Sequence, residues 1–291
     1  MNSLKIWLSA FRLRTLPLAA ASITLGSFLA AFDSAFQWRV TILCFLTAVL
    51  LQILSNLAND YGDSVHGADS GNRVGPERAT QSGKISTKSI RFALLVFTSL
   101  CLIVGYLLIR GESLFFHLSG LAAIAAAVAY TLGPKYGYTG LGDIFVFLFF
   151  GLIGVFGTYY LHTHQLNFQI VLPAATCGLF CVGVLNINNI RDLHSDKLAG
   201  KNTIPVRFGQ RKARIYHWVL LLSALGFALI FVLLNYRNPW QFLFLITLPL
   251  VLKNAVGISL QSNAADLDPH LKQMAITTLL FSFCFGVGIL L

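Results

Sequence analysis

Charged side chains are scarce in this chain of 291 residues. Asp, Glu, Lys and Arg make up 11% of the sequence, and hydrophobic residues make up 56%, whereas a typical soluble domain is about 25% charged. So few polar side chains cannot cover the apolar surface that a water-soluble fold would expose. The composition therefore excludes a soluble domain and predicts an all-α, polytopic membrane protein that forms one domain over residues 1–291.

Paired cysteines are also missing. The chain has 5 cysteines, all of them in apolar runs and none in a CxxC pair. We interpret them as buried thiols, which argues against a disulfide framework or a cysteine-based zinc site. A cleavable signal peptide is not evident either, because the first apolar segment is followed by further long apolar runs, and we expect this segment to stay as a helix.

Apolar runs of about 20 residues, the length that crosses a bilayer, are abundant. Three prolines fall inside these runs, which membrane helices tolerate. The runs predict about nine transmembrane helices, at residues 14–32, 40–59, 91–109, 114–132, 142–162, 169–190, 215–235, 240–258 and 273–291.

Basic residues are distributed unevenly between the two sides that nine spans define. One side carries the N-terminus and the segments 60–90, 133–141, 191–214 and 259–272. With Arg91 and Lys253 at helix ends counted on this side, it holds 18 of the 21 Lys and Arg residues. Since positive loops stay in the cytoplasm, we expect a cytoplasmic (inner) membrane protein with a cytoplasmic N-terminus and its C-terminus on the opposite side. This placement explains the net charge of +10 without a nucleic-acid partner.

Acidic residues gather on the same side, in two clusters that follow apolar runs. In the later cluster, Asn188, Asp192 and Asp196 have i, i+4, i+8 spacing, which places them on one face of a helix. Lys201 and Arg207 follow. We therefore expect the active site at the cytoplasmic side of the bundle.

The earlier cluster has the same organisation. Asn56, Asp60 and Asp63 close the second apolar run. Basic residues follow this cluster too, at Arg73, Arg78 and Lys84.

Four carboxylates brought together would repel one another unless a cation lay between them. Mg²⁺ prefers oxygen ligands and is commonly bound through a few carboxylates and the phosphates of a substrate. The neighbouring basic residues suit phosphate oxygens, with Arg able to bind them bidentately. The two clusters therefore predict one site for a magnesium-bridged diphosphate, with Asp60, Asp63, Asp192 and Asp196 as the metal ligands.

Two strings within these clusters resemble a known family. NDYGD at 59–63 and NNIRDLHSD at 188–196 are similar to the two Asp-rich motifs of the UbiA superfamily of membrane prenyltransferases, and RATQSG at 78–83 and KNTIPVRFG at 201–209 also agree with its pattern. The longer strings NLANDYGD, YTLGPKYGYTGLGDIFVFLFFG at 130–151 and GTYY at 157–160 resemble its members that prenylate 1,4-dihydroxy-2-naphthoate.

The chain departs from the family pattern at two places. The first motif usually has a third Asp four residues after Asp63, where this chain has Gly67, and Asp69 stands two residues further on. The family's Tyr-xxx-Lys element appears as Tyr130 and Lys135, with one extra residue between them. Both departures concern the set of ligands rather than the type of reaction.

The resemblance implies a Mg²⁺-dependent polyprenyltransferase of menaquinone biosynthesis. Its donor would be an allylic polyprenyl diphosphate, its acceptor 1,4-dihydroxy-2-naphthoate, and its by-products CO₂ and diphosphate. The lipid bilayer would accommodate the polyprenyl tail. Together with the spacing argument, the resemblance assigns the catalytic role to the four Asp residues and diphosphate binding to Asn56, Arg73, Arg78, Lys84, Tyr130, Lys135, Asn188, Lys201 and Arg207.

Acceptor binding is assigned to Tyr138, Asp143 and Lys253. Two alternatives remain open at this point: a sister enzyme that uses 4-hydroxybenzoate or another aromatic acceptor, and a cation-coupled transporter. Acids that gather at one side, and bases that follow each acidic cluster, count against the transporter. The length of the prenyl chain and the oligomeric state are left open.

Overall fold

The computed structural model describes residues 3–65, 78–261 and 263–291, and these ranges contain helices and no strand. The α-helices are α1 (Ser3–Ala10), α2 (Leu16–Phe32), α3 (Trp38–Val65), α4 (Thr87–Ile109), α5 (Leu114–Ala129), α6 (Gly142–Val146), α7 (Thr158–Thr163), α8 (Val171–Arg191), α9 (Leu193–Leu198), α10 (Ile204–Leu234), α11 (Leu248–Leu260) and α12 (Asp268–Leu290). The remaining helical segments are η1 (Leu13–Thr15), η2 (Tyr136–Tyr138), the π-helical η3 (Phe147–Gly157), η4 (Phe168–Ile170), η5 (Pro239–Thr247) and η6 (Ala264–Leu267).

In the described part of the chain, 8 helical spans are long and apolar enough to cross a membrane, and α5 is a shorter apolar helix of 16 residues. Five of these spans combine several elements; for example, Gly142–Thr163 joins α6, η3 and α7, and Pro239–Leu260 joins η5 and α11. The predicted fold class is confirmed, and the protein is an all-α, multi-pass membrane protein.

Several helix starts differ from the apolar runs. The helix α10 begins at Ile204, well before the run predicted from residue 215, and Gly209 (φ 82°, ψ 162°) interrupts it. A search for apolar residues missed this start because the first turns of α10 are polar.

Three helices have a proline in their first turn: Pro17 in α2, Pro249 in α11 and Pro269 in α12. The first-turn N–H groups have no partner within the helix, so proline costs no hydrogen bond there.

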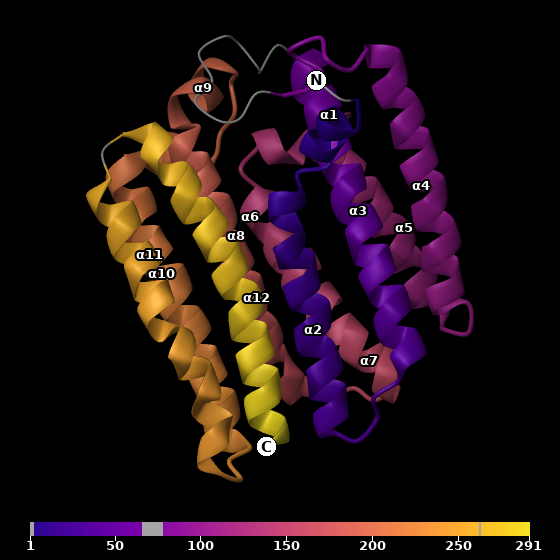
Figure 1. Cartoon of the computed structure of the whole chain (residues 1–291), viewed down its shortest axis with the longest axis vertical. Helices are drawn as coiled ribbons and strands as arrows, with labels where there is room; N and C mark the ends of the chain where they lie inside the picture. Colours follow the sequence, from indigo (N-terminus) through magenta and orange to yellow (C-terminus); the bar gives the residue numbers. More distant parts are fainter. Residues whose placement is uncertain (1–2, 66–77, 262) are drawn as a thin grey trace.

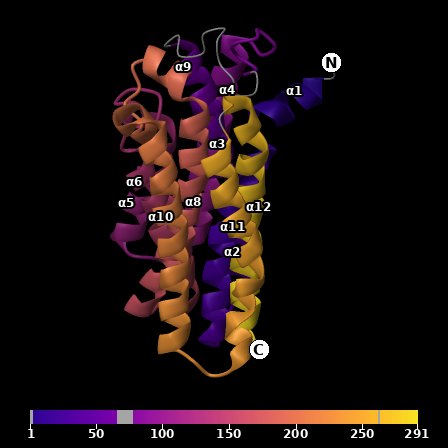
Figure 2. The ribbon, with the colours of Figure 1, turned by 90° about the vertical axis from the view of Figure 1, so that its left-hand side faces the viewer.

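The helices run roughly along the long axis of the molecule (Figures 1 and 2). The N-terminus and α9 lie at one end, and the C-terminus lies at the other (Figure 1). The end of α3 and the end of α8, which carry the two Asp-rich clusters, therefore meet at the same end of the bundle. The helix α8 packs against α10, α12 and η3, and α12 packs against α2.

The core around α8 contains closely packed rings and one very close backbone approach. The ring centroids of Phe180 and Phe281 are 4.9 Å apart, and those of Phe244 and Phe281 are 5.4 Å apart. A Cβ added to Gly151 of η3 would lie 2.9 Å from the Cα of Gly178 on α8. This contact holds the α6–η3 segment directly against α8.

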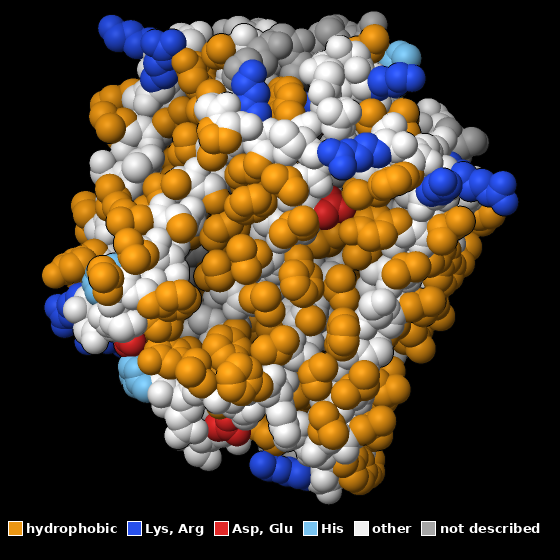
Figure 3. All heavy atoms as spheres, turned by 180° about the vertical axis from the view of Figure 1, so that it is seen from behind, with side chains coloured by type: hydrophobic (Ala, Val, Ile, Leu, Met, Phe, Trp, Pro, Cys, Tyr) orange, Lys and Arg blue, Asp and Glu red, His pale blue; other side chains and the backbone are white. Residues whose placement is uncertain are grey.

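One broad face of the molecule is covered mainly by hydrophobic side chains, with Lys and Arg mostly toward one end (Figure 3). Exposed residues such as Phe92, Leu95 and Ile103 of α4 belong to the same kind of surface. Such a surface is what a bundle surrounded by lipid requires.

Candidate active site

A cavity of about 1090 Å³ lies between the helices. Its polar lining includes Asn56 and Asp63 of α3, and Asn188, Asp192 and Asp196 from the segment of α8 and α9. The rest of the lining is mostly apolar and extends to residues from the opposite end of the bundle, such as Leu166 and Phe168. One cavity thus joins a charged end to a long hydrophobic part.

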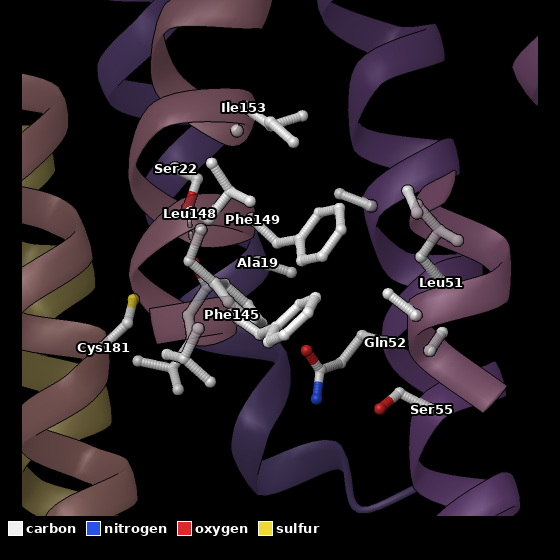
Figure 4. A pocket seen from close by; sticks show the side chains of 18 of the residues that line it. Ala19, Ser22, Leu51, Gln52, Ser55, Phe145, Leu148, Phe149, Ile153 and Cys181 are labelled. Atoms are coloured by element: carbon white, nitrogen blue, oxygen red, sulfur yellow. Dashed lines mark hydrogen bonds between the residues drawn. The ribbon is translucent and has the colours of Figure 1, made fainter. Parts of the chain in front are cut away.

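Aromatic side chains line the hydrophobic part close to the charged end. Phe145 of α6 and Phe149 of η3 project toward Leu51, Gln52 and Ser55 of α3 (Figure 4). Their rings lie 6.1 Å apart, nearly parallel at 21°. They form an apolar wall opposite a helix face that carries polar groups.

Asp63, in the last turns of α3, is the most extensively contacted carboxylate of the first cluster. Its oxygens accept a hydrogen bond from the Tyr138 hydroxyl at 2.7 Å and lie 2.5 Å from Arg78 Nη2 and 3.4 Å from Lys201 Nζ. The side chain is 2% exposed. This carboxylate therefore joins α3 to three segments that are distant from it in sequence.

Gly62 explains how the segment around Tyr130 comes so close to α3. A Cβ at this position would lie 2.4 Å from Thr131 Oγ1, and that hydroxyl donates to the Ala58 carbonyl at 2.9 Å. Tyr130 is next to this contact and lines the cavity. Burial raises the pKa of the Tyr130 phenol, so it remains a protonated donor.

Asp60 lies differently from Asp63. It is 2% exposed but does not line the cavity. Its Oδ1 is buried and has no hydrogen-bond partner among the described residues. Asn56, one turn earlier, lines the cavity and donates to the Phe11 carbonyl at 3.0 Å and to Thr15 Oγ1 at 3.2 Å, which holds the N-terminal segment against α3.

The second cluster spans the junction of α8 and α9. The helix assignment is interrupted at Asp192 (φ −90°, ψ 8°), whereas the sequence predicted one uninterrupted helix. The Asp192 amide nevertheless donates to the Asn188 carbonyl at 2.9 Å, and the Asp196 amide donates to the Asp192 carbonyl at 2.8 Å. The α-helical hydrogen-bond pattern persists, and all three side chains line the cavity.

Lys201 connects the two clusters. Its Nζ lies 3.4 Å from a carboxylate oxygen of Asp63 and 3.4 Å from one of Asp196, and 4.8 Å from the ring centroid of Tyr138. Burial raises the pKa of Asp196 to about 6; Lys201 opposes this rise, and the negative charge of Asp192 adds to it. The acids of the two clusters are thus close enough to interact, and one cation is shared between them.

Sequence reasoning missed Arg191 and Asp268. Arg191 Nε and Nη2 each donate to Asp192 at 2.8 Å, and Nη1 donates to Asp268 Oδ1 at 2.6 Å. The sequence suggested only a solvated loop around Asp268, whose carboxylate also pairs with Arg14 at 2.9 Å. A signal existed at Arg191, because it is a charge at the end of an apolar run and directly precedes Asp192.

Besides Asp60, five predicted site residues in the described part of the chain do not line the cavity. Arg207 is exposed and donates from Nη2 to the Thr139 carbonyl. Asp143 accepts a hydrogen bond from Tyr216 at 3.0 Å. Lys84 and Lys253 are exposed, and Lys135 is intermediate in exposure. Arg73 and Asp69 lie outside the described residues.

The donor set fits Mg²⁺ held together with a ligand. Among the described residues, no three acidic, His or Cys side chains form a group that could hold a metal ion by themselves. However, Asp63, Asp192 and Asp196 line one cavity, and Asp60 Oδ1 is buried without a partner. Oxygen donors spread around a cavity match an ion that is completed by water and substrate phosphates.

Residues 20–288 match the UbiA prenyltransferase family. The chain belongs to this family. It is 44% identical to the 1,4-dihydroxy-2-naphthoate octaprenyltransferase of Haemophilus influenzae, over 100% of this chain and 97% of that protein. It is 41% identical to the Escherichia coli protein of the same name, over 98% of this chain and 95% of that protein.

The fold of this UbiA prenyltransferase also resembles a solved structure. A UbiA homologue from Archaeoglobus fulgidus, bound to DMAPP and Mg²⁺, superposes with a TM-score of 0.69 at 16% identity, covering 97% of this chain and 98% of the other. Membership of the family confirms the resemblance drawn from the two Asp-rich strings, and excludes the transporter alternative.

Proposed function

We propose that this UbiA prenyltransferase transfers a polyprenyl group from an allylic polyprenyl diphosphate to 1,4-dihydroxy-2-naphthoate. The allylic C–O bond breaks and its electron pair leaves with diphosphate. A C–C bond forms between the allylic carbon and an electron-rich ring carbon, and the bond from the ring to its carboxylate breaks to release CO₂ and return its electron pair to the aromatic ring. The relatives from Haemophilus influenzae and Escherichia coli, which match over nearly their full length, support this acceptor. The observation that carries the proposal is the single cavity with a charged end and a long hydrophobic part.

The charged end would bind the diphosphate. Arg78 and Lys201 line the cavity beside Asp63, and their positive charges would attract phosphate oxygens. The leaving diphosphate gains charge as the allylic bond breaks, so contacts to it strengthen in the transition state and accelerate the reaction. The hydroxyl of Tyr138, 2.7 Å from Asp63, would orient that carboxylate.

Asp63, Asp192 and Asp196, which line the cavity, would hold Mg²⁺ with the diphosphate. When bound, Mg²⁺ supplies positive charge that stabilises the departing diphosphate. The Archaeoglobus fulgidus homologue was solved with Mg²⁺, which supports the same metal here.

The hydrophobic part of the cavity would hold the prenyl tail. Phe145 and Phe149 stand near the charged end, where they would border the allylic carbons and exclude water from the reactive cation. We further infer that the charged end faces the cytoplasm in the inner membrane, because 18 of the 21 basic residues belong to that side.

The direct test is to incubate the protein, purified in detergent, with Mg²⁺, polyprenyl diphosphates of several lengths and one aromatic acid at a time. Product masses identify both substrates. We expect a prenylated naphthalenediol that has lost the mass of CO₂, and no product from the Asp63→Asn variant. Turnover of 4-hydroxybenzoate but not of 1,4-dihydroxy-2-naphthoate would contradict the proposed acceptor.

A further inference from the structure

Arg191 is engaged on all three of its nitrogens, although it does not line the cavity. Nε and Nη2 donate to the two carboxylate oxygens of Asp192 at 2.8 Å each. Nη2 also donates to Asn188 Oδ1 at 2.7 Å, and Nη1 donates to Asp268 Oδ1 at 2.6 Å. Its side chain is 1% exposed. One guanidinium thus binds Asn188 and Asp192, two of the three cavity-lining residues of the second cluster.

Asp268 places that guanidinium. It is the first residue of α12. Its carboxylate forms an ion pair with Arg191 at 2.6 Å and another with Arg14 of η1 at 2.9 Å. Because α12 packs against both α2 and α8, the position of Asp268 is determined by the assembly of the bundle. The chain Arg14–Asp268–Arg191–Asp192 therefore connects three segments far apart in sequence and ends at the cavity.

We propose that Arg191, anchored by Asp268, is a positioning residue that fixes Asn188 and Asp192 in the arrangement that receives the magnesium diphosphate. The proposal rests on the proposed function. A bidentate guanidinium–carboxylate pair fixes the plane of the carboxylate as well as its distance. Held in this plane, the Asp192 side chain still lines the cavity in which the magnesium diphosphate would bind.

Simple neutralisation of the buried Asp192 charge is the competing role, and the two roles differ in what they require. Neutralisation needs a positive charge near Asp192, which Lys also provides. Positioning needs the planar fork and its anchor at Asp268. Arg191→Lys keeps the charge and loses the fork, so it separates the two roles.

The experiment measures metal binding without turnover. Purified wild-type protein in detergent receives a polyprenyl thiolodiphosphate, which resists cleavage, and is titrated with Mn²⁺ while free Mn²⁺ is followed by electron paramagnetic resonance. We expect Arg191→Lys and Arg191→Gln to weaken Mn²⁺ binding by roughly 10- to 100-fold, the usual effect of losing a group that orients a metal ligand. Asp268→Asn should weaken it by about tenfold, and Asp268→Glu should recover part of that loss.

Asp268 carries the test if the buried Arg191 variants fail to fold, because its side chain is 38% exposed. Asp266→Asn is the matched control. Asp266 is exposed in the adjacent η6, and its substitution removes the same charge as Asp268→Asn. This control should leave Mn²⁺ binding unchanged. Thermal unfolding of each variant in detergent separates a loss of binding from a loss of fold.

Wild-type Mn²⁺ affinity in Arg191→Lys and in Asp268→Asn, with or without a lower Tm, would overturn the positioning role. Absence of Mn²⁺ binding in the wild type with the analogue present would overturn it as well. Wild-type binding of Mn²⁺ that is weakened in these variants, in a protein that does not prenylate 1,4-dihydroxy-2-naphthoate, would support positioning and reject the proposed acceptor.

Discussion

The two Asp-rich clusters differ in where their arginine comes from. Asp63 pairs with Arg78, which follows α3 in the sequence and itself lines the cavity. Asp192 pairs with Arg191, its own neighbour on α8, which is buried behind the lining. A ligand in the cavity can reach Arg78 but not Arg191. Similar acid–base patterns therefore serve different purposes: Arg78 is accessible to a substrate, whereas Arg191 contacts its own cluster and Asp268.

Loss of a cavity-lining carboxylate from either cluster should have the largest effect. Asp63→Asn or Asp192→Asn removes a proposed metal ligand and should lower kcat by a factor on the order of 10³ or more, equivalent to several kcal/mol of transition-state stabilisation. Removal of metal with EDTA should abolish turnover in the wild type, and added Mg²⁺ should restore it. Wild-type turnover by a metal-free preparation would show that the two clusters do not share a metal.

Arg78→Lys should sharpen the contrast between arginines. The substitution keeps the charge beside Asp63 but loses the bidentate geometry toward phosphate. We therefore expect a lower kcat and a higher KM for the donor, which together lower kcat/KM by roughly 10- to 100-fold. The acceptor KM should stay close to that of the wild type.

Arg207→Lys is the matched control, because Arg207 is exposed, does not line the cavity and donates to the Thr139 carbonyl. We expect less than a threefold change for this variant, within the range of ordinary surface substitutions. Equal losses in both variants would mean that Arg207 also reaches the diphosphate, as the sequence pattern suggested.

Gly62→Ala tests the contact that brings the Tyr130 segment to the first cluster. The added Cβ would collide with Thr131, and overpacking of this kind costs about 1–3 kcal/mol. We expect a lower Tm together with weaker donor binding. The control is Gly226→Ala on α10, which does not line the cavity, where a Cβ meets nothing within 4 Å and where Ala favours the helix. Donor binding as strong as in the wild type in Gly62→Ala would show that this contact does not contribute to the donor site.

Apart from the control variants, Tyr138→Phe should have the smallest effect. It removes one hydrogen bond to Asp63 but leaves Arg78 and Lys201 beside that carboxylate. The expected loss in kcat/KM for the donor is about 2- to 13-fold, equivalent to roughly 0.5–1.5 kcal/mol, the contribution of a typical hydrogen bond, because the two cations keep the Asp63 charge paired. A loss as large as that of Asp63→Asn would assign the phenol a direct role in the reaction.

The fold class and the family could be predicted from the sequence alone. The number of membrane-spanning helices could be predicted to within one. These follow from local properties: hydropathy over about 20 residues, the placement of Lys and Arg, and the strings around Asp60 and Asp192. The sequence also predicted Asp63, Asp192 and Asp196, which line the cavity, because each lies one or two helical turns after Asn56 or Asn188.

The tertiary structure alone decided which of the candidate residues meet. Asp268 joins Arg191 across 77 residues of sequence, and Lys201 joins Asp63 across 138; no spacing rule relates residues that far apart. Arg207 and Arg78 look equivalent in the sequence, since each follows an acidic cluster, but one is exposed and the other is buried against Asp63. The physical reason is that these positions depend on how whole helices pack, and packing is determined by the combined contacts of the bundle and not by any single segment.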